Sequence, residues 1–165
     1  MNVLYIFDLD QTLVRPVEGL KVPNSIREQV IIPGVVEQCA RFRELGAKLS
    51  IASNQGGVSL GICTLEEAQE RVKHVANAIG AEHWMISIFH EQATRNMAYF
   101  HIPFVGTTSH PYYRKPAPGM LLHLMMQFRA NAPDTWFIGD QESDCEAARN
   151  AGVQFAWAKD FFGWS

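Results

Sequence analysis

Two pairs of acidic residues stand directly after short apolar runs of the chain. Asp8 and Asp10 follow one run, and Asp140 and Asp144 follow another. In an extended segment, residues two apart face the same side, so Asp8 and Asp10 can enter one pocket. Carboxylates this close repel one another unless they share a proton or a cation, and Mg²⁺ prefers oxygen ligands. The acids therefore predict a metal-assisted site, with a solvated turn at Asp8 and a helix N-cap at Asp144 as the alternatives.

Two further segments offer hydrogen-bond donors and positive charge for an anion. Residues 51–57 end an apolar run with a hydroxyl, an amide and two glycines. The backbone N–H groups of such a loop, around Ser53 and Asn54, can hold phosphate oxygens, although the same residues also suit a plain turn. Lys115 stands just before a proline-led helix start. Its positive charge is unfavourable beside the positive end of the helix dipole unless an anion lies between the lysine and the helix N-terminus. The alternative is a basic surface pair of Arg114 and Lys115.

Apolar runs and helix-period segments alternate along the chain. The strands expected are 3–7, 47–52, 84–89, 135–138 and 153–157, and the helices expected are 33–46, 64–80, 118–129 and 143–150. Thr64 and Glu67 have the spacing of a capping box. Apolar strands separated by helices predict an α/β fold, a three-layer, Rossmann-like arrangement in which helices cover both faces of a mostly parallel, five-stranded sheet. Ligands bind at the carboxyl ends of the strands in such sheets, which is where the acids stand.

The composition is that of one ordinary globular domain. With 165 residues, 47% of them hydrophobic and 19% charged, the chain is not generally disordered and needs no disulfide or metal to hold its core. A net charge of −3 provides no overall positive potential that would bind long nucleic acid non-specifically. The three cysteines are expected to be reduced thiols. Because neither a signal-peptide pattern nor an apolar run of about 18 residues occurs, we expect a cytoplasmic protein without membrane contact.

Taken together and in this order, four motifs resemble those of the haloacid dehalogenase-like (HAD) hydrolase superfamily. They are Asp8-Leu9-Asp10-Gln11-Thr12, Ser53-Asn54, Lys115, and Gly139-Asp140 with Asp144. The segments Ser53-Asn54-Gln55-Gly56-Gly57 and Tyr113-Arg114-Lys115-Pro116 are similar to subfamily III. That group includes heptose bisphosphate phosphatase, the histidinol-phosphate phosphatases and the phosphatase domain of polynucleotide kinase-phosphatase. The resemblance spans Leu4 to about Trp157.

The resemblance implies a Mg²⁺-dependent phosphatase that hydrolyses a phosphate monoester through an aspartyl-phosphate intermediate. In this mechanism Asp8 is the nucleophile, and Asp10 is the general acid and then the general base. An acid at position 10 is a feature that this sequence shares with the phosphatases of the superfamily. The dehalogenases and the transport ATPases lack an acid at the matching position. Gln11 departs from the pattern, because relatives often have Gly at this point, and it either alters the turn or points into the site.

The resemblance also assigns the remaining site residues. The implied Mg²⁺ ligands are Asp8, the backbone carbonyl of Asp10, Asp140, and Asp144 acting directly or through water or Lys115. The implied phosphate-binding residues are Ser53, Asn54 and Lys115, with Arg114 contacting the substrate. Heptose-type relatives carry a Cys/His zinc loop before the Arg-Lys-Pro motif. Here His90, His101 and His110 precede Lys115 without a cysteine, so we expect no structural zinc.

The spacing of the motifs bears on the substrate. We expect a single HAD-like domain over residues 1–165 with no large cap domain, a short flap at about 13–32 and an irregular, substrate-side insertion at about 90–114. Such an open site can admit a large or polymeric substrate or its flexible end, but the net charge of −3 favours a small phosphate ester, a sugar phosphate or nucleotide. A polynucleotide 3′ end, with Tyr112 or Tyr113 stacking on a base, is the alternative. A non-catalytic HAD-fold binding protein is the third hypothesis, and the sequence predicts no oligomeric state.

Overall fold

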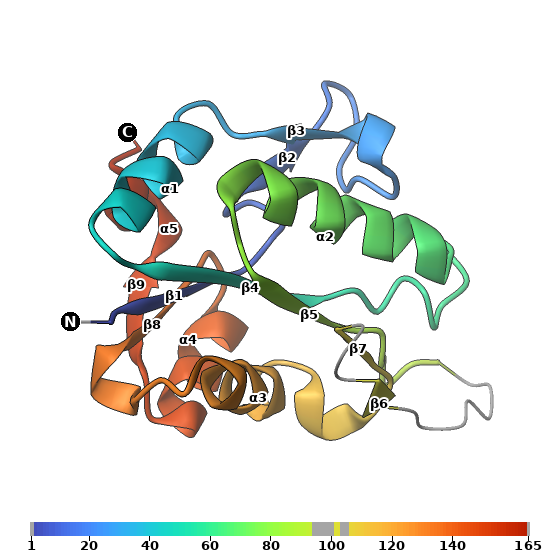
Figure 1. The fold of residues 1–165 in the computed structure, drawn as a ribbon. Helices are drawn as coiled ribbons and strands as arrows, with labels where there is room; N and C mark the ends of the chain where they lie inside the picture. Colours follow the sequence, from blue (N-terminus) through green and yellow to red (C-terminus); the bar gives the residue numbers. More distant parts are fainter. Residues whose placement is uncertain (1, 94–100, 103–105, 165) are drawn as a thin grey trace.

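The computed structural model describes residues 2–93, 101–102 and 106–164 (Figure 1). In these residues the main sheet consists of β1 Leu4–Phe7, β4 Lys48–Asn54, β5 His83–Ser87, β6 His101–Ile102, β7 Thr107–Thr108, β8 Thr135–Gly139 and β9 Gln154–Trp157. Their order across the sheet is β6-β7-β5-β4-β1-β8-β9. Neighbouring strands pair in parallel, except that β6 runs antiparallel to β7.

Helices cover both faces of this sheet. Their bounds are α1 Val35–Glu44, α2 Leu65–Ile79, α3 Gly119–Phe128, α4 Glu142–Ala151 and α5 Ala158–Phe162. Figure 1 shows α1, α2 and α5 on one face, and α3 and α4 on the other. Among the helices of the described ranges, none has the length and apolarity that crossing a bilayer requires.

A second, two-stranded sheet lies between β1 and α1 in the sequence. It pairs β2 Val14–Pro16 antiparallel with β3 Gln29–Ile31, on the same side of the main sheet as α1 and α2 (Figure 1). The 3-10 helices are η1 Ile26–Glu28, η3 Pro111–Tyr113 and η4 Ala132–Asp134. The chain between β1 and α1 is described throughout and contains only β2, η1 and β3, so no large cap domain is inserted there.

The strand β1 shows why the apolar runs form the central strands. Leu4 and Ile6 pack with the layer of α3 and α4. Tyr5 and Phe7 pack with the layer of α1, α2 and α5. Because successive side chains of a strand point to opposite faces, a strand covered on both faces is apolar at every position.

The connections between strands change direction at β1. From β1 the chain runs to β4 and then β5 on one side, and later it forms β8 and β9 on the other side. In an open α/β sheet, the point where the strand order reverses leaves a crevice at the carboxyl ends of the strands. The carboxyl ends of β4, β1 and β8 therefore meet at one edge, with β1 in the middle.

The α/β class and the mostly parallel sheet between helical layers are confirmed, but the predicted count of five strands is wrong. The five predicted strands form close to their expected bounds, and β6 and β7 add to the sheet beside β5. Both added strands are two residues long and lie within residues 90–114, which the sequence predicted as irregular. Strands this short carry no periodicity. β7 forms by pairing with β5, about twenty residues earlier in the chain, and β6 pairs with β7.

The helix α2 begins with the predicted capping box. The Thr64 hydroxyl accepts a hydrogen bond from the backbone N–H of Glu67 at 3.0 Å. The backbone N–H of Thr64 donates to the Glu67 carboxylate at 3.3 Å. Two N–H groups at the start of the helix are thus satisfied by side chains. The helix ends at Gly80, which has a left-handed φ of 74°.

Replacing Thr64 by alanine is expected to lower the free energy of unfolding by about 1 kcal/mol, because the cap is lost. In a domain of this size, that corresponds to a fall in Tm of roughly 2–4 °C by calorimetry. Thr64→Ser keeps the hydroxyl and is the matched control. An alanine variant with the Tm of the parent would show that the box contributes nothing to stability.

Candidate active site

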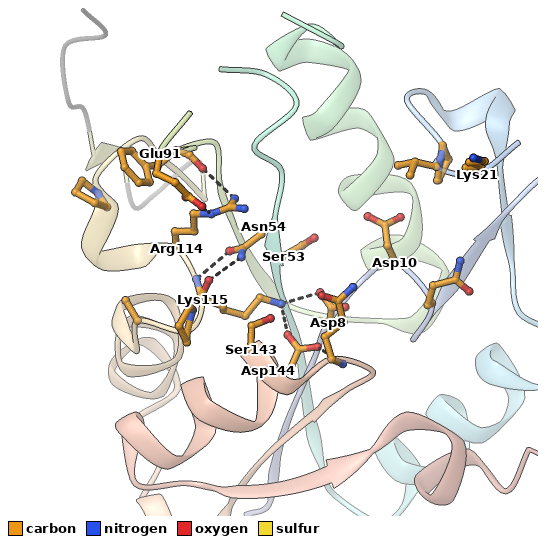
Figure 2. Close-up of a pocket in the computed structure, with 18 residues that line it drawn as sticks. Asp8, Asp10, Lys21, Ser53, Asn54, Glu91, Arg114, Lys115, Ser143 and Asp144 are labelled. Carbon is orange, nitrogen blue, oxygen red and sulfur yellow. Dashed lines mark hydrogen bonds and ion pairs between the residues drawn. The ribbon is translucent and has the colours of Figure 1, made fainter. Parts of the chain in front are cut away.

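The predicted site residues converge at the edge of the sheet where β4, β1 and β8 end. Asp8 directly follows β1, and its backbone N–H donates to the carbonyl of Ile138 in β8 at 2.9 Å. Ser53 and Asn54 are the last residues of β4, and Asp140 follows β8. Because these strands are neighbours in parallel register, residues far apart in the sequence share one crevice (Figure 2).

The ammonium group of Lys115 lies in the middle of this crevice. Its Nζ lies 2.8 Å from Asp8 Oδ1, 2.7 Å from Asp144 Oδ1 and 3.1 Å from the Ala52 carbonyl oxygen. An ammonium has three N–H donors, so all of them are satisfied. The side chain is 4% exposed and also lies over the Phe137 ring. Burial alone would lower the pKa of Lys115, but the two carboxylates raise it above its ordinary range.

Asn54, the last residue of β4, fixes the backbone of Lys115. Its amide nitrogen donates to the Lys115 carbonyl, and its amide oxygen accepts from the Lys115 N–H, each at 3.0 Å. The side chain of Asn54 thus joins the end of β4 to the segment before α3. The Lys115 charge consequently points into the crevice and not along the axis of the helix that it precedes.

Asp144 combines a capping role with a charge role. It is the third residue of α4, and its Oδ2 accepts from the backbone N–H groups of Asp140 and Gln141 at 3.1 Å each. Its Oδ1 is bound to Lys115. A Cβ at Gly139 would lie 2.5 Å from Asp144 Oδ2, so only glycine leaves room for this carboxylate. The N-cap of α4 is Gln141, so the expectation of an N-cap at Asp144 is wrong. From the third helical position, one Asp144 oxygen accepts from the N-cap backbone N–H and the other contacts Lys115.

The carboxylates of Asp8, Asp140 and Asp144 form a cluster with excess negative charge. One oxygen of each lies within 4.8 Å of the others. Burial raises the pKa of Asp8 well above its usual range despite the nearby Lys115, and burial also raises the pKa of Asp140. The Oδ1 atom of Asp140 is buried and has no hydrogen-bond partner among the residues that the structure describes. Three carboxylates against one ammonium leave a net charge of about −2, so the donor set fits a hard divalent cation.

The loop after β4 supplies small and polar groups. Ser53 is buried, and its Oγ accepts a hydrogen bond from the Gln55 amide at 2.9 Å. A Cβ at Gly56 would lie 2.8 Å from His90 Cδ2 and 2.9 Å from Arg114 Nη1. The glycine therefore allows the segment after β5 and Arg114 to approach the loop closely. The arrangement leaves Ser53 at the floor of the crevice and Arg114 at its side.

Asp10 stands apart from the Lys115 cluster. Its carboxylate pairs with the guanidinium of Arg71 in α2 and accepts from the Gln55 amide at 3.2 Å. Figure 2 shows the Asp10 carboxyl group set away from Asp8 and Lys115 across the crevice. Gln11, the next residue, has a left-handed φ of 63°, a conformation that favours glycine, and it lines the cavity. Gln11 therefore strains the turn after Asp10 and borders the cavity.

Arg71 and Gln55 were missed as partners of Asp10. Position 71 falls on the buried face of α2, three residues after Ala68 and four before Val75. An arginine among apolar residues at helical spacing was the available signal, because a buried charge requires a partner. The identity of that partner depends on which strand end α2 covers, and helical spacing does not report this.

Asp8, Ser53 and Lys115 line a cavity of about 710 Å³. Its walls include Lys21, Val22 and Pro23 from the segment between β2 and β3, together with Arg114. The Arg114 Nε atom lies 3.3 Å from a Glu91 carboxylate oxygen, and its Nη1 donates to the Phe89 carbonyl at 3.0 Å (Figure 2). The volume falls in the range typical of small-molecule sites.

Comparisons with known proteins agree with this geometry. The family model described as polynucleotide kinase 3 phosphatase matches residues 3–162. The D-glycero-beta-D-manno-heptose-1,7-bisphosphate 7-phosphatase of Pseudomonas putida is 30% identical over 135 residues, which are 79% of this chain and 69% of that protein. The D-glycero-D-manno-heptose-1,7-bisphosphate 7-phosphatase of Chlorobaculum tepidum is 27% identical and covers 93% of this chain and 76% of its own.

Solved structures share the fold at low sequence identity. The D,D-heptose 1,7-bisphosphate phosphatase of B. bronchiseptica, complexed with magnesium and phosphate, matches with a TM-score of 0.72 at 19% identity, covering 94% of this chain and 79% of that chain. A HAD-like phosphatase of Mesorhizobium loti also matches with a TM-score of 0.72, at 21% identity, covering 93% and 69%. From the family match and the convergent strand-end acids, the chain belongs to the polynucleotide kinase 3 phosphatase family, within the HAD superfamily of phosphatases.

Proposed function

We propose that this phosphatase hydrolyses a phosphate monoester of a small phosphorylated sugar, with Mg²⁺ and through a phosphoaspartyl intermediate on Asp8. The observation that carries the proposal is the Asp8 carboxylate itself. It lies at the floor of a cavity, 2.8 Å from a buried ammonium and beside two further carboxylates. An anion that attacks an anionic ester needs this positive charge, because the repulsion would otherwise oppose the reaction.

Asp8, Asp140 and the backbone carbonyl of Asp10 would hold the metal ion. When bound, Mg²⁺ supplies charge that stabilises the phosphoryl oxygens in the transition state. The unpartnered Oδ1 of Asp140 supports this assignment. Both oxygens of Asp144 are already engaged, by Lys115 and by two backbone N–H groups. Asp144 therefore acts chiefly through Lys115.

The reaction proceeds in two displacements at phosphorus. In the first, an Asp8 oxygen forms a bond to phosphorus, the bond to the leaving oxygen breaks, and Asp10 gives its proton to that oxygen. In the second, Asp10 takes a proton from water as the water oxygen attacks phosphorus. The bond to Asp8 then breaks and inorganic phosphate is released. The Ser53 hydroxyl and the backbone N–H of Asn54 bind the phosphoryl oxygens, and the Lys115 ammonium, whose three N–H donors are engaged by the protein, attracts them through its charge.

The curated relatives support a sugar phosphate as the substrate. Their names assign them to heptose 1,7-bisphosphates, and the chain aligns with them over most of its length. Arg114 and Lys21 border the cavity beyond the phosphate loop, where they suit a second anionic group of the substrate. Residues 13–32 act as the flap over this side, since three of their side chains line the cavity.

A polynucleotide end is the second candidate, because the matching family is described as polynucleotide kinase 3 phosphatase. Tyr112 is 48% exposed beside Arg114, so a base could stack on its ring. The net charge of −3 weighs against a long anionic substrate.

A panel of esters separates these candidates. With Mg²⁺ present, kcat/KM is expected to be highest for sugar mono- or bisphosphates and lower for nucleotides and for 3′- and 5′-phosphorylated oligonucleotides. Arg114→Gln should reduce kcat/KM for a bisphosphate more than for the matching monophosphate. A preference for 3′-phosphorylated oligonucleotides that weakens steeply with added salt would favour the polynucleotide function instead. A chain inactive on the whole panel would be a binding protein.

Asp8→Asn is expected to reduce kcat by roughly 10³-fold or more, because the amide cannot form the phosphoenzyme. Phosphate binding, followed by calorimetry, should persist, since Ser53 and Lys115 remain. The control is Asp160→Asn, which removes an exposed acid in α5. Near-normal turnover by Asp8→Asn would exclude the covalent mechanism.

Removal of the metal tests the carboxylate cluster. A chelator should abolish activity, and added Mg²⁺ should restore it. Asp140→Asn should raise the Mg²⁺ concentration for half-maximal activity by roughly tenfold or more, because one anionic ligand is lost. Asp134→Asn, in η4 just before β8 and not part of the cavity lining, is the matched control. Activity that survives exhaustive chelation would contradict the proposed metal dependence.

A further inference from the structure

Arg71 is a fully buried cation outside the Lys115 cluster. It lies on α2 with 2% of its surface exposed, among apolar neighbours on the same helix face such as Ala68, Val72 and Val75. It belongs to neither the phosphate loop nor the carboxylate cluster. The proposed two-step hydrolysis gives it no role.

The guanidinium of Arg71 joins three separate segments. Its Nε donates to the Gln29 amide oxygen at 2.9 Å, and its Nη1 donates to the Gln55 amide oxygen at 3.1 Å. Its Nη2 donates to Asp10 Oδ1. The contacts therefore run from α2 to β3, to the phosphate loop and to the turn after the nucleophile strand.

Gln55 closes a ring of hydrogen bonds around Asp10. While its amide oxygen accepts from Arg71, its amide nitrogen donates to Asp10 Oδ2 at 3.2 Å. Each Asp10 oxygen thus has one fixed donor, and the carboxyl group cannot rotate without breaking one of the two bonds. Asp10 is 32% exposed and lines the cavity, so lone pairs of its oxygens remain open to a ligand.

Stability alone does not account for this arrangement. Burying an ion pair costs desolvation free energy that its Coulomb attraction only partly offsets, and an apolar side chain at position 71 would pack as well. A pair held by three hydrogen-bonded segments can instead serve to fix the orientation of the carboxyl group. In general acid catalysis, geometry controls the rate, because the donor must lie within hydrogen-bond reach of the leaving oxygen.

We propose that Arg71, acting with Gln55, is the positioning residue that holds the Asp10 carboxyl group in place for proton transfer to the leaving oxygen. The inference rests on the proposed function, because it takes Asp10 as the proton donor. It adds that the orientation of this donor is set from α2 and is tied, through Gln29, to the β2–β3 sheet.

The test compares leaving groups. An alkyl phosphate needs a proton on its leaving oxygen, whereas p-nitrophenyl phosphate leaves well without one. Because kcat/KM reports the steps up to departure of the leaving group, Arg71→Met should lower it for the alkyl ester roughly tenfold more than for the aryl ester. A general loss of structure would lower both equally. Asp10→Asn provides the reference, and Arg71→Met should cause no further selective loss in its background.

Arg71→Lys serves if the methionine variant does not fold. It keeps a cation beside Asp10 but lacks the planar group that bonds three partners at once, so its selective loss should be smaller but present. Equal losses for the two esters in the Arg71 variants, with a selective loss in Asp10→Asn, would overturn the role of Arg71 alone. Equal losses in Asp10→Asn itself would overturn the proposed role of Asp10, and the inference with it.

Discussion

The contact between Lys115 and its two carboxylates is the interaction on which the rest of the site depends. An ammonium that is 4% exposed would be very costly to bury without partners, and Asp8, Asp144 and the Ala52 carbonyl satisfy all three of its donors. In turn, Lys115 offsets part of the repulsion among three clustered carboxylates. The ammonium and the carboxylates each offset the cost of burying the other. The excess negative charge that remains suits a divalent cation.

The sheet brings the three charged groups of this contact together. Residues 8, 115 and 144 are far apart in sequence, yet they meet because β1 lies between β4 and β8 and the strand order reverses there. Local bonds then refine each group. Asn54 holds the backbone of Lys115 from the end of β4, and the first turn of α4 holds Asp144. The site is therefore built on the ends of rigid elements, each of which is secured by one further hydrogen-bonded neighbour.

Features that depend on strand ends could be predicted from the sequence, whereas features that depend on helix placement could not. Asp8, Ser53 and Asp140 could be expected to lie together, since carboxyl ends of parallel strands share an edge. The pairing of Asp10 with Arg71 could not be expected, because it depends on which strand end α2 covers. The two short strands β6 and β7 were missed for a related reason: β7 pairs with β5 and β6 pairs with β7, and strands of two residues leave no local pattern. The roles of the individual residues in catalysis remain proposals.

Gly139 carries a consequence for how this chain tolerates change. The position touches no ligand and has no chemistry of its own, but the space where its first side-chain carbon would stand is occupied by Asp144. A single methyl group added there would push on the carboxylate that anchors the buried lysine, and the disturbance would reach Asp8 through that lysine. At this point of the strand, the limit on the residue type is therefore one of volume and not of chemistry.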